Sequence, residues 1–182
     1  MTVNGLAHAR WSRRQLLSAA ATTLALPLTT TWAAPAPAAS TIDWSALRLL
    51  DEKGDGPAHW SGLPVVVVFW ATWCPYCKRH NAHVEKLYQH TQGQRLRVLG
   101  VTDETDTDKI ANSVQAQQIH FPIAMAPTAF RAQFTSRRVV PLTCVVGADG
   151  RVLQSLPGEM TLEDVMSLAT VAGVANPKIK AV

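Results

Sequence analysis

The segment from Val65 to His83 constrains the possible folds of this chain more than any other stretch. It begins with a continuous β-branched and aromatic run, Val65 to Trp70, which is the pattern of a strand covered on both faces by helices. The run leads directly to Cys74 and Cys77, and the residues that follow are polar and compatible with a helix. We therefore expect a buried central strand that delivers a cysteine pair to the start of a helix.

The position of the cysteine pair suggests redox chemistry. Cys74 stands where the helix should begin, and Pro75 occupies the first helical position, where a missing N–H costs nothing. The unpaired N–H groups and the positive end of the helix dipole then favour a thiolate at the first sulfur. Cys77 follows one turn later, and this spacing can bring the two Cα atoms within disulfide range. The pair can thus cycle between dithiol and disulfide. The alternative is two unrelated buried cysteines, which would not require a position at the start of a helix.

The positive charge of the chain is concentrated near its first residue. The formal net charge of +4 comes from 17 Lys and Arg against 13 Asp and Glu. Three of the basic residues, Arg10, Arg13 and Arg14, lie before residue 34 in a stretch without acids, which leaves 14 bases against 13 acids elsewhere, a net charge of +1. The remainder also has no cluster of Lys and Arg interleaved with aromatic residues. These observations exclude a nucleic-acid or anionic-membrane footprint from the main part of the chain.

Residues 1–33 have the pattern of a twin-arginine-type signal peptide. Arg13 and Arg14 precede a mildly apolar run to Leu28, and small residues allow cleavage after Ala33 or after Ala38. An uncleaved membrane anchor is the alternative, but an apolar run of about 13 residues is shorter than the roughly 20 needed to span a bilayer. We expect an Ala/Pro-rich spacer at 34–41 and a periplasmic mature protein. In such an oxidising compartment a cysteine pair is structural or catalytic.

Strand and helix patterns alternate along the rest of the chain. A short strand or hairpin is expected before the central strand, and strands and helices then follow in the order β-α-β-α-β-α-β-β-α, which implies an α/β sandwich with parallel strands and one antiparallel hairpin. The expected ranges after the central strand are a helix from Cys74 to about Gln89, a strand at Leu96–Val101, a helix through Ile110 to about Gln118, a strand at Phe121–Met125, a helix at Thr128–Phe134, strands at Val139–Val146 and Arg151–Leu156, and a helix at Leu162–Ala172.

An acidic cluster, Asp103-Glu104-Thr105-Asp106, follows the second of the parallel strands. Paired carboxylates can perform general acid and base catalysis. Here, however, Asp and Thr fall just before the helix that contains Ile110. We therefore interpret the cluster as a helix cap that also complements the helix dipole.

Two patterns together resemble the thioredoxin superfamily, in particular its exported TlpA-like branch. They are Phe69-Trp70-Ala71-Thr72-Trp73-Cys74-Pro75-Tyr76-Cys77 and, later, Val139-Val140-Pro141 followed by Gly147-Ala148-Asp149-Gly150-Arg151-Val152. The resemblance covers about residues 42–172. It implies a thioredoxin-like three-layer α/β/α sandwich with a mixed central sheet at 42–175, followed by a tail at 176–182.

The same resemblance implies roles for particular residues. Cys74 would be the nucleophile, Cys77 the resolving thiol, and Pro141 a cis-proline that faces the disulfide. A cis X-Pro bond is only slightly less stable than trans, so a fold can hold it. The backbone of Val140 is then free to pair with an extended substrate chain.

An apolar surface around the disulfide is the expected binding site for protein substrates. Apolar rims of this kind are typical of partner sites. Trp70, by contrast, is expected in the core. The residues expected to contact substrate are Trp73, Pro75, Tyr76, Val140 and Pro141.

Three positions depart from the resemblance, and they concern proton transfer. Val68 stands where thioredoxins have a buried aspartate, Ala82 where they have a proline, and His80 where many TlpA-like proteins have a glutamate. No acid beneath the disulfide can therefore relay a proton. Cys77 would lose its proton to solvent or to His80, one turn along the helix.

Positive groups near the helix start are expected to tune the first cysteine. A free thiol with a pKa near 8.5 is only about 3% ionised at pH 7, so an efficient nucleophile needs a lower pKa. The helix N-terminus, Lys78, Arg79 and protonated His80 all favour a negative Cys74. We therefore predict a lowered Cys74 pKa and a disulfide that is a stronger oxidant than that of thioredoxin.

Some of these residues could also serve other chemistries. Cys74, Cys77 and His80 could converge on a thiophilic ion such as Cu(I), with His83 turning away, but solvated histidines beside a redox pair are the favoured reading and no metal site is predicted. A peroxiredoxin would need a Pro-x-x-x-Thr-x-x-Cys loop, which this sequence lacks. Cys144 lies among valines and is expected to be an inert core thiol.

The sequence thus predicts an exported thiol-disulfide oxidoreductase that acts as a disulfide reductase through a mixed disulfide on Cys74. Its alternative is a copper-binding or copper-delivery module. The expected partners are protein dithiols or disulfides and an upstream thiol electron donor, without nucleic acid and with membrane contact only through the signal segment. The protein is expected to be a monomer and to need no cofactor besides the Cys74–Cys77 disulfide.

Overall fold

The structure is a computed structural model that describes residues 41–51 and 57–174. All of the described residues belong to one compact unit, Ala38–Val182. The signal segment, the C-terminal tail and all but the last residue of the spacer predicted above lie outside the described residues. In the described part, no helix is both long and apolar enough to cross a membrane.

The elements follow the predicted order. A short strand and a 3-10 helix, β1 (Arg48–Leu49) and η1 (Pro57–Trp60), come before the central strand. The remaining elements are β2 (Val65–Phe69), α1 (Pro75–Thr91), β3 (Arg97–Thr102), α2 (Thr107–Ala116), β4 (Ile123–Met125), α3 (Thr128–Ala132), β5 (Leu142–Val146), β6 (Val152–Pro157) and α4 (Leu162–Val171).

The strands form one mixed sheet in the order β1-β4-β3-β2-β5-β6. β2, β3 and β4 are parallel, and β5 runs antiparallel to β2 and pairs with β6 in the predicted hairpin. The short first strand is also confirmed, but the alternative of a hairpin into β2 is wrong. Arg48 pairs instead with Met125 of β4, because the other side of β2 is already occupied by β5.

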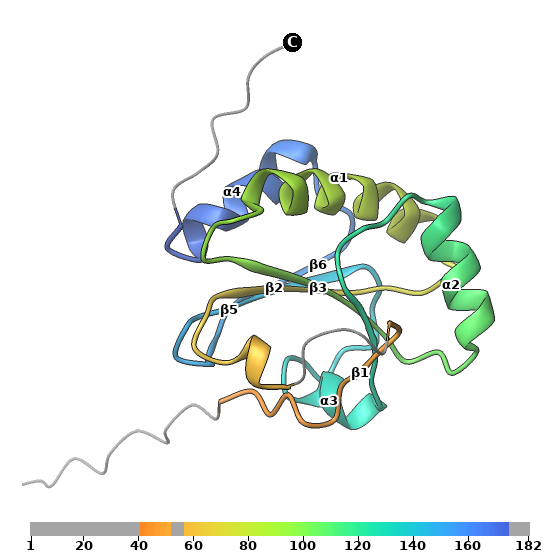
Figure 1. The fold of residues 1–182 in the computed structure, drawn as a ribbon, viewed down its shortest axis with the longest axis horizontal. Coiled ribbons are helices and arrows are strands. Elements are labelled where there is room, and N and C mark those ends of the chain that lie inside the picture. Colours follow the sequence, from red (N-terminus) through yellow and green to blue (C-terminus); the bar gives the residue numbers. More distant parts are fainter. Residues whose placement is uncertain (1–40, 52–56, 175–182) are drawn as a thin grey trace, which may run out of the picture. The chain divides into compact units, whose positions relative to one another are not determined.

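Side chains of β2 alternate between two cores, which produces the three layers seen in Figure 1. Val66 and Val68 point to the face covered by α1 and α4, whereas Val65, Val67 and Phe69 point to the face that carries α3. Every residue of β2 is buried, as expected for a strand covered on both faces. The predicted three-layer α/β/α sandwich is confirmed.

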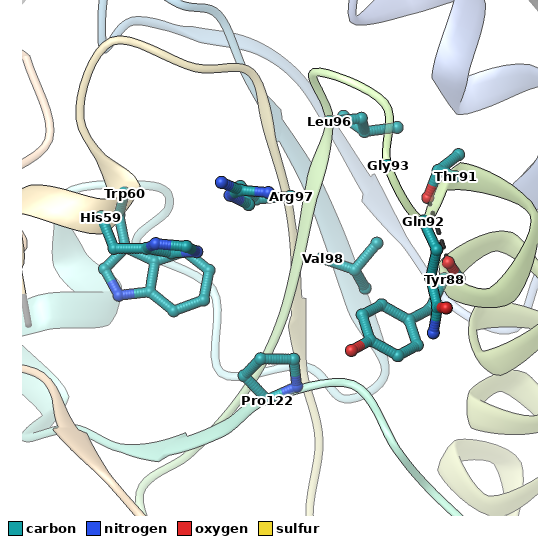
Figure 2. Close-up of a pocket in the computed structure, with 10 residues that line it drawn as sticks. All are labelled: His59, Trp60, Tyr88, Thr91, Gln92, Gly93, Leu96, Arg97, Val98 and Pro122. Atoms are coloured by element: carbon teal, nitrogen blue, oxygen red, sulfur yellow. Dashed lines mark hydrogen bonds between the residues drawn. The ribbon is translucent and has the colours of Figure 1, made fainter. Parts of the chain in front are cut away.

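A cavity of about 400 Å³ lies at the amino-terminal end of β2 and β3, away from the cysteines (Figure 2). Arg97, which begins β3 and pairs with Val65, lies between Trp60 on one side and Tyr88 on the other. Cys74 follows the opposite end of β2. None of the site residues predicted from the sequence lines this cavity, and the cysteine pair lies at the other end of the strands.

Candidate redox site

The cysteine pair lies at the junction between β2 and α1. The Cys74 N–H donates to the Ala71 carbonyl at 3.3 Å, so a tight turn links the strand to the helix. Cys74 is the N-cap of α1 with an extended backbone, and its sulfur accepts the Cys77 N–H at 3.1 Å. Pro75 then occupies the first helical position, where no N–H is required. The predicted helix start is therefore confirmed.

The two cysteines form a disulfide, with their Cα atoms 5.3 Å apart. Their accessibility differs, because Cys74 retains 4% of its surface and Cys77 has none. Only the first cysteine therefore offers any surface to an incoming thiol or disulfide. The expected nucleophile and resolving roles require this asymmetry.

The segment before β5 brings a backbone carbonyl to the first sulfur. The Val140–Pro141 peptide bond is cis, as the resemblance implied, and Leu142 opens β5 opposite Phe69 at the end of β2. The carbonyl oxygen of Val140 lies 3.8 Å from the Cys74 sulfur. Pro141 itself is buried and Val140 is half-buried, so of these two predicted contact residues Val140 offers the larger surface to a substrate.

Two aromatic side chains are exposed beside the disulfide. Trp73 is 69% and Tyr76 57% exposed, the two largest exposed fractions among the described large hydrophobic residues. Pro75 between them is also exposed, whereas Trp70 is buried as expected. An apolar surface next to a reactive disulfide is suited to binding a protein segment.

The charge of Arg79 is not free to act on Cys74. Its guanidinium makes two hydrogen bonds to Glu159, of 2.8 and 2.6 Å, and lies 4.9 Å from the Tyr76 ring centroid. The hydrogen bond to Arg79 is the main reason that the pKa of Glu159 lies below its ordinary value, so the carboxylate stays charged at neutral pH. Arg79 and Lys78 are both exposed, but the Arg79 charge is compensated by Glu159.

His80 was expected to be solvated and to be protonated beside Cys74, and the structure differs from both expectations. It is completely buried, not solvated, and burial lowers its pKa to about 4, so it carries no charge at neutral pH. The Met160 N–H donates to its Nδ1 atom at 3.2 Å, and its Nε2 atom lies 2.8 Å from the Thr143 hydroxyl. Nδ1 is therefore the acceptor and Nε2 carries the hydrogen. The expectation that protonated His80 stabilises the thiolate is wrong.

The same contacts bear on its other expected roles. Because Nδ1 already accepts the Met160 N–H, it has no lone pair left for the Cys77 proton or for a metal. His83 uses its Nδ1 atom on the Met160 carbonyl at 3.0 Å. In the part of the chain that the structure describes, no group of three or more His, Cys, Asp or Glu side chains could hold a metal ion. Both ring nitrogens of His80 are thus engaged within the protein, so His80 is not available as the third ligand of the copper interpretation.

The acidic cluster after β3 has two functions rather than one. Asp106 caps α2 by accepting the Lys109 N–H, as predicted. Glu104 does not cap the helix, and that part of the interpretation is wrong. Its carboxylate accepts the backbone N–H of Thr72 at 2.6 Å and the Thr72 hydroxyl at 2.7 Å. No local sequence signal indicated this contact, because the two residues are 32 positions apart.

The third cysteine is not part of the site. Cys144 is fully buried in β5, on the face opposite α1, and burial raises the pKa of its thiol to about 11. A thiol held neutral in this way is a poor nucleophile. The predicted core position of Cys144 is confirmed, and the inertness of its thiol stays a prediction.

Comparisons with known proteins agree with this geometry. Residues 52–154, more than half of the chain, match the AhpC/TSA family. Among curated proteins, the thiol-disulfide oxidoreductase ResA of Bacillus thuringiensis is 26% identical over 123 residues, and that of Bacillus subtilis is 24% identical over 125. Each match covers 67% of this chain and 66% or 65% of the relative. The chain therefore spans slightly less than two thirds of the length of these relatives.

Solved structures confirm the fold. A secreted disulfide oxidoreductase of Mycobacterium tuberculosis superposes with a TM-score of 0.57 at 17% identity, covering 70% of this chain and 92% of that one. StoA from Bacillus subtilis gives 0.56 at 20% identity, covering 66% and 94%. A secreted thiol-disulfide isomerase of Corynebacterium glutamicum gives 0.61 at 18% identity, covering 80% and 98%. With its cysteine pair at the start of α1 and its cis-proline before β5, the chain belongs to the AhpC/TSA family and, within the thioredoxin superfamily, to the TlpA-like branch.

Proposed function

We propose that this protein is an exported thiol-disulfide oxidoreductase that reduces disulfides in protein substrates through a mixed disulfide on Cys74. The observation that carries the proposal is the unequal accessibility of the two sulfurs at the start of α1. Cys74 keeps a small exposed surface, whereas Cys77 is fully buried. A partner can thus bond only to the first sulfur, and the second can release it. The names of the ResA relatives point to the same class of reaction.

The reaction is a two-electron exchange. In the dithiol form the Cys74 thiolate attacks one sulfur of a substrate disulfide, a mixed disulfide forms, and the other substrate sulfur leaves as a thiolate. Cys77 then loses its proton to water and attacks the Cys74 sulfur, which releases the second substrate thiol. The substrate disulfide is reduced, and the Cys74–Cys77 disulfide is regenerated. An upstream thiol donor must return two electrons to this disulfide before the next cycle.

Stabilisation of the attacking thiolate comes mainly from the helix start. The Cys77 N–H points at the Cys74 sulfur at 3.1 Å, and the positive end of the α1 dipole adds to it. Lys78 is exposed on the first turn and contributes a screened positive charge. Since Arg79 is paired and His80 is neutral, we expect a smaller decrease in the Cys74 pKa than three nearby cations would produce.

Substrate binding is assigned to the surface around Cys74. Trp73, Pro75 and Tyr76 supply apolar contact area, and the Val140 backbone supplies polar groups next to the sulfur. Apolar area together with backbone hydrogen bonding is how proteins bind extended segments of varied sequence. We therefore assign unfolded or extended protein segments as the substrate class.

Export is the remaining part of the proposal. It is supported by the Arg13-Arg14 pair before an apolar run and by the fact that the Mycobacterium tuberculosis and Corynebacterium glutamicum proteins are named as secreted. In the periplasm the Cys74–Cys77 pair would meet substrates whose disulfides form readily. A monomer suffices for this chemistry.

Reduction of insulin with dithiothreitol as electron donor tests the proposed activity. The wild-type protein should accelerate the reaction, and Cys74→Ser should abolish the acceleration. Cys144→Ala serves as the matched control, because it removes a thiol that the site does not use, and it should retain the wild-type rate. A wild-type rate equal to the uncatalysed rate would refute the proposal. In a parallel Cu(I) titration of the reduced protein, His80→Gln should bind the ion no more weakly than the wild type, because both ring nitrogens of His80 are engaged within the protein.

A further inference from the structure

The turn between β2 and α1 determines the position of the reactive sulfur. Thr72 and Trp73 are its central residues, and it is closed by the hydrogen bond from Cys74 to Ala71. On one side Trp70 still donates to Val101 of β3, and on the other side α1 begins. The turn therefore connects a rigid sheet to a rigid helix. Any displacement of the turn moves the Cys74 sulfur relative to the N–H groups of α1.

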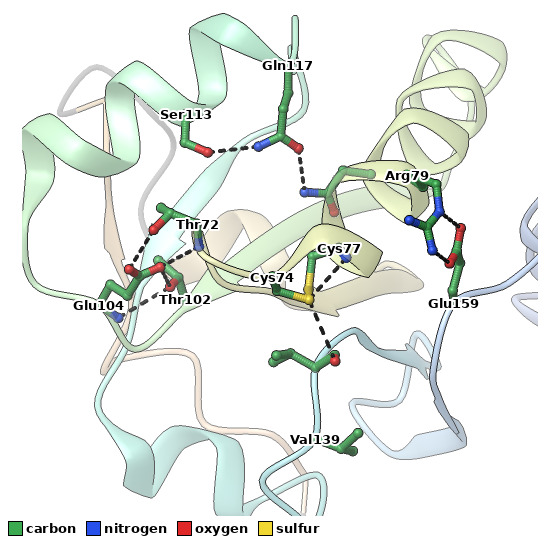
Figure 3. The surroundings of a disulfide bond; sticks show 12 residues. Thr72, Cys74, Cys77, Arg79, Thr102, Glu104, Ser113, Gln117, Val139 and Glu159 are labelled. Atoms are coloured by element: carbon green, nitrogen blue, oxygen red, sulfur yellow. Dashed lines mark hydrogen bonds and ion pairs between the residues drawn. A yellow bond between two sulfur atoms is a disulfide. The ribbon is translucent and has the colours of Figure 1, made fainter.

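Glu104 holds this turn from the segment that follows the neighbouring strand, β3. Its Oε2 atom accepts the Thr72 N–H at 2.6 Å, and its Oε1 atom accepts the Thr72 hydroxyl at 2.7 Å. Figure 3 shows the carboxylate directed at Thr72 from the segment after β3, with Cys74 beyond the turn. Of the two central residues of the turn, Thr72 is the one next to β2, and its N–H makes no hydrogen bond within the sheet. Two hydrogen bonds accepted by one ionised carboxylate are stronger and more directional than hydrogen bonds between neutral groups.

The carboxylate is itself held in place. Its side chain is only 15% exposed, and Lys109 donates to Oε1 at 2.9 Å. The Thr102 hydroxyl accepts the Glu104 N–H at 3.3 Å and lies 3.5 Å from Oε2. Burial alone would raise the pKa of Glu104, but hydrogen bonds from the Thr72 N–H, Lys109 and the Thr72 hydroxyl outweigh it and lower the pKa. The group is therefore charged at neutral pH.

The stability of α2 does not explain this arrangement. The N-cap function is performed by Asp106, whose Oδ1 atom accepts the Lys109 N–H at 3.0 Å. Glu104 lies two residues before that cap and points to a different element. A carboxylate that is mostly buried, paired and directed at the loop before a redox cysteine has a role in that loop.

We infer that Glu104 is a positioning residue of the redox site, which fixes the Ala71–Cys74 turn so that the Cys74 sulfur stays aligned with the Cys77 N–H and open to substrate. The inference rests on the proposed function and adds a residue to it. The attacking sulfur must approach the substrate disulfide along its axis. Because a misplacement of about 1 Å can cost up to roughly 100-fold in rate, a fixed turn matters for turnover.

Two variants of Glu104 separate position from charge. Glu104→Ala and Glu104→Gln lose the same negative charge, but the Gln amide can still accept the Thr72 N–H and donate to the Thr72 hydroxyl. We expect kcat/KM for insulin reduction to fall roughly tenfold in Glu104→Ala and to be largely restored in Glu104→Gln. The rate with a small disulfide should fall by the same factor, because the sulfur is misplaced and the substrate surface is intact.

The thiolate pKa of Cys74 gives a second readout that needs no turnover. Both variants remove the same charge, so electrostatics cancels when they are compared with each other. We expect the pKa, followed by thiolate absorbance, to be higher in Glu104→Ala than in Glu104→Gln, because only the former loses alignment with the Cys77 N–H. Hydrogen exchange of the Thr72 amide should accelerate in Glu104→Ala and remain slow in Glu104→Gln.

Asp106→Ala is the matched control, because it removes the cap of α2 and leaves the Glu104 bonds to Thr72 intact. It should retain the wild-type rate and Thr72 exchange even if it lowers the melting temperature. Equal rates and equal thiolate pKa values in the two Glu104 variants would overturn the inference, and so would an Asp106→Ala protein as slow as Glu104→Ala. A wild-type protein that does not reduce insulin would instead refute the proposed function, while the pKa and exchange measurements would still decide the role of Glu104.

Discussion

The ring of His80 and the hydroxyl of Thr143 lie 2.8 Å apart in the interior of the protein, although 63 residues separate them in the sequence. His80 comes from the second turn of α1 and Thr143 from β5, where it pairs with Val68. The bond therefore ties the helix that carries the cysteines to the strand that follows Pro141. With its other nitrogen on the Met160 N–H, the histidine is a neutral, fully bonded group of the core.

A pH dependence of stability follows from this burial. The pKa of His80 is about 4 in the folded protein against 6.5 for an ordinary histidine, so between these values the unfolded chain binds a proton that the folded protein does not. The stabilisation is complete above pH 6.5, is lost as the pH falls, and stops changing below pH 4. The loss should be roughly 3 kcal/mol.

Urea unfolding at pH 7.5 and pH 4 measures this loss. A His80→Gln variant should lose less stability than the wild type between the two pH values, because the titrating group is gone. His90→Gln changes an exposed histidine of the same helix and should retain the wild-type loss. If His80→Gln and wild type lose equal stability, His80 is not the group responsible.

The second prediction concerns the covalent intermediate. In Cys77→Ala the mixed disulfide on Cys74 cannot be resolved, so substrate proteins should remain attached. Non-reducing electrophoresis and mass spectrometry of periplasmic extracts would detect these adducts and place the bond on Cys74. A Cys74→Ala protein that traps as many substrates through Cys77 would contradict the accessibility argument, because Cys77 is fully buried.

The third prediction tests the aromatic surface. Trp73 is the most exposed large hydrophobic residue in the described chain, and aromatic residues often dominate the energy of protein contacts. Trp73→Ala should lower kcat/KM for insulin by about tenfold while the rate with a small disulfide changes little. Leu153→Ala is a matched control, since Leu153 is exposed on β6, and it should leave both rates unchanged. Equal losses with both substrates would show that Trp73 acts on the sulfur instead.

The fourth prediction concerns the ion pair between Arg79 and Glu159. Glu159→Gln releases the guanidinium, which then adds an unpaired positive charge on the first turns of α1. The Cys74 pKa should fall slightly and the reaction rate at pH 7 should rise, by no more than about threefold. Both effects should disappear in 1 M salt, because exposed charges are screened. A lower rate in Glu159→Gln would instead mean that the ion pair positions α1, and that it does not act by compensating the charge of Arg79.

The fifth prediction concerns export. Replacing Arg13 and Arg14 with lysine should prevent the mature protein from reaching the periplasm, because the twin-arginine route depends on this pair. Cell fractionation and immunoblotting would show the precursor accumulating in the cytoplasm. Arg10→Lys is the control, since it changes a nearby arginine outside the pair. Normal periplasmic amounts of the double variant would show that export does not depend on these arginines.

The sequence alone determined the elements that depend on neighbouring residues. The run at Val65–Phe69 is buried on both faces and forms the central strand, because five consecutive apolar side chains cannot be exposed on either face. Cys74 caps α1 with Pro75 behind it, since both features are local backbone chemistry. Gly93 follows the helix with φ of 78°, a conformation that glycine adopts without strain.

Tertiary structure decided what depends on distant partners. His80 looked like a solvated helix residue beside the cysteines, yet packing of α1 against β5 and the segment before α4 buried it. Glu104 looked like part of a helix cap, yet the parallel pairing of β2 with β3 brought it to Thr72 at the end of the neighbouring strand. The partner of β1 is β4, and this pairing at the edge of the sheet depends on the order of all six strands.

The difference has one physical reason. Periodicity and capping are set by side chains within a few residues of one another, so the sequence carries them directly. The charge state of a histidine and the partner of a carboxylate depend on solvent exclusion and on atoms 32 to 80 residues away, which only the packed fold brings together. The sequence thus specified where the redox pair lies and which sulfur comes first, and the tertiary structure determined which groups hold that sulfur in place and which remain uncharged.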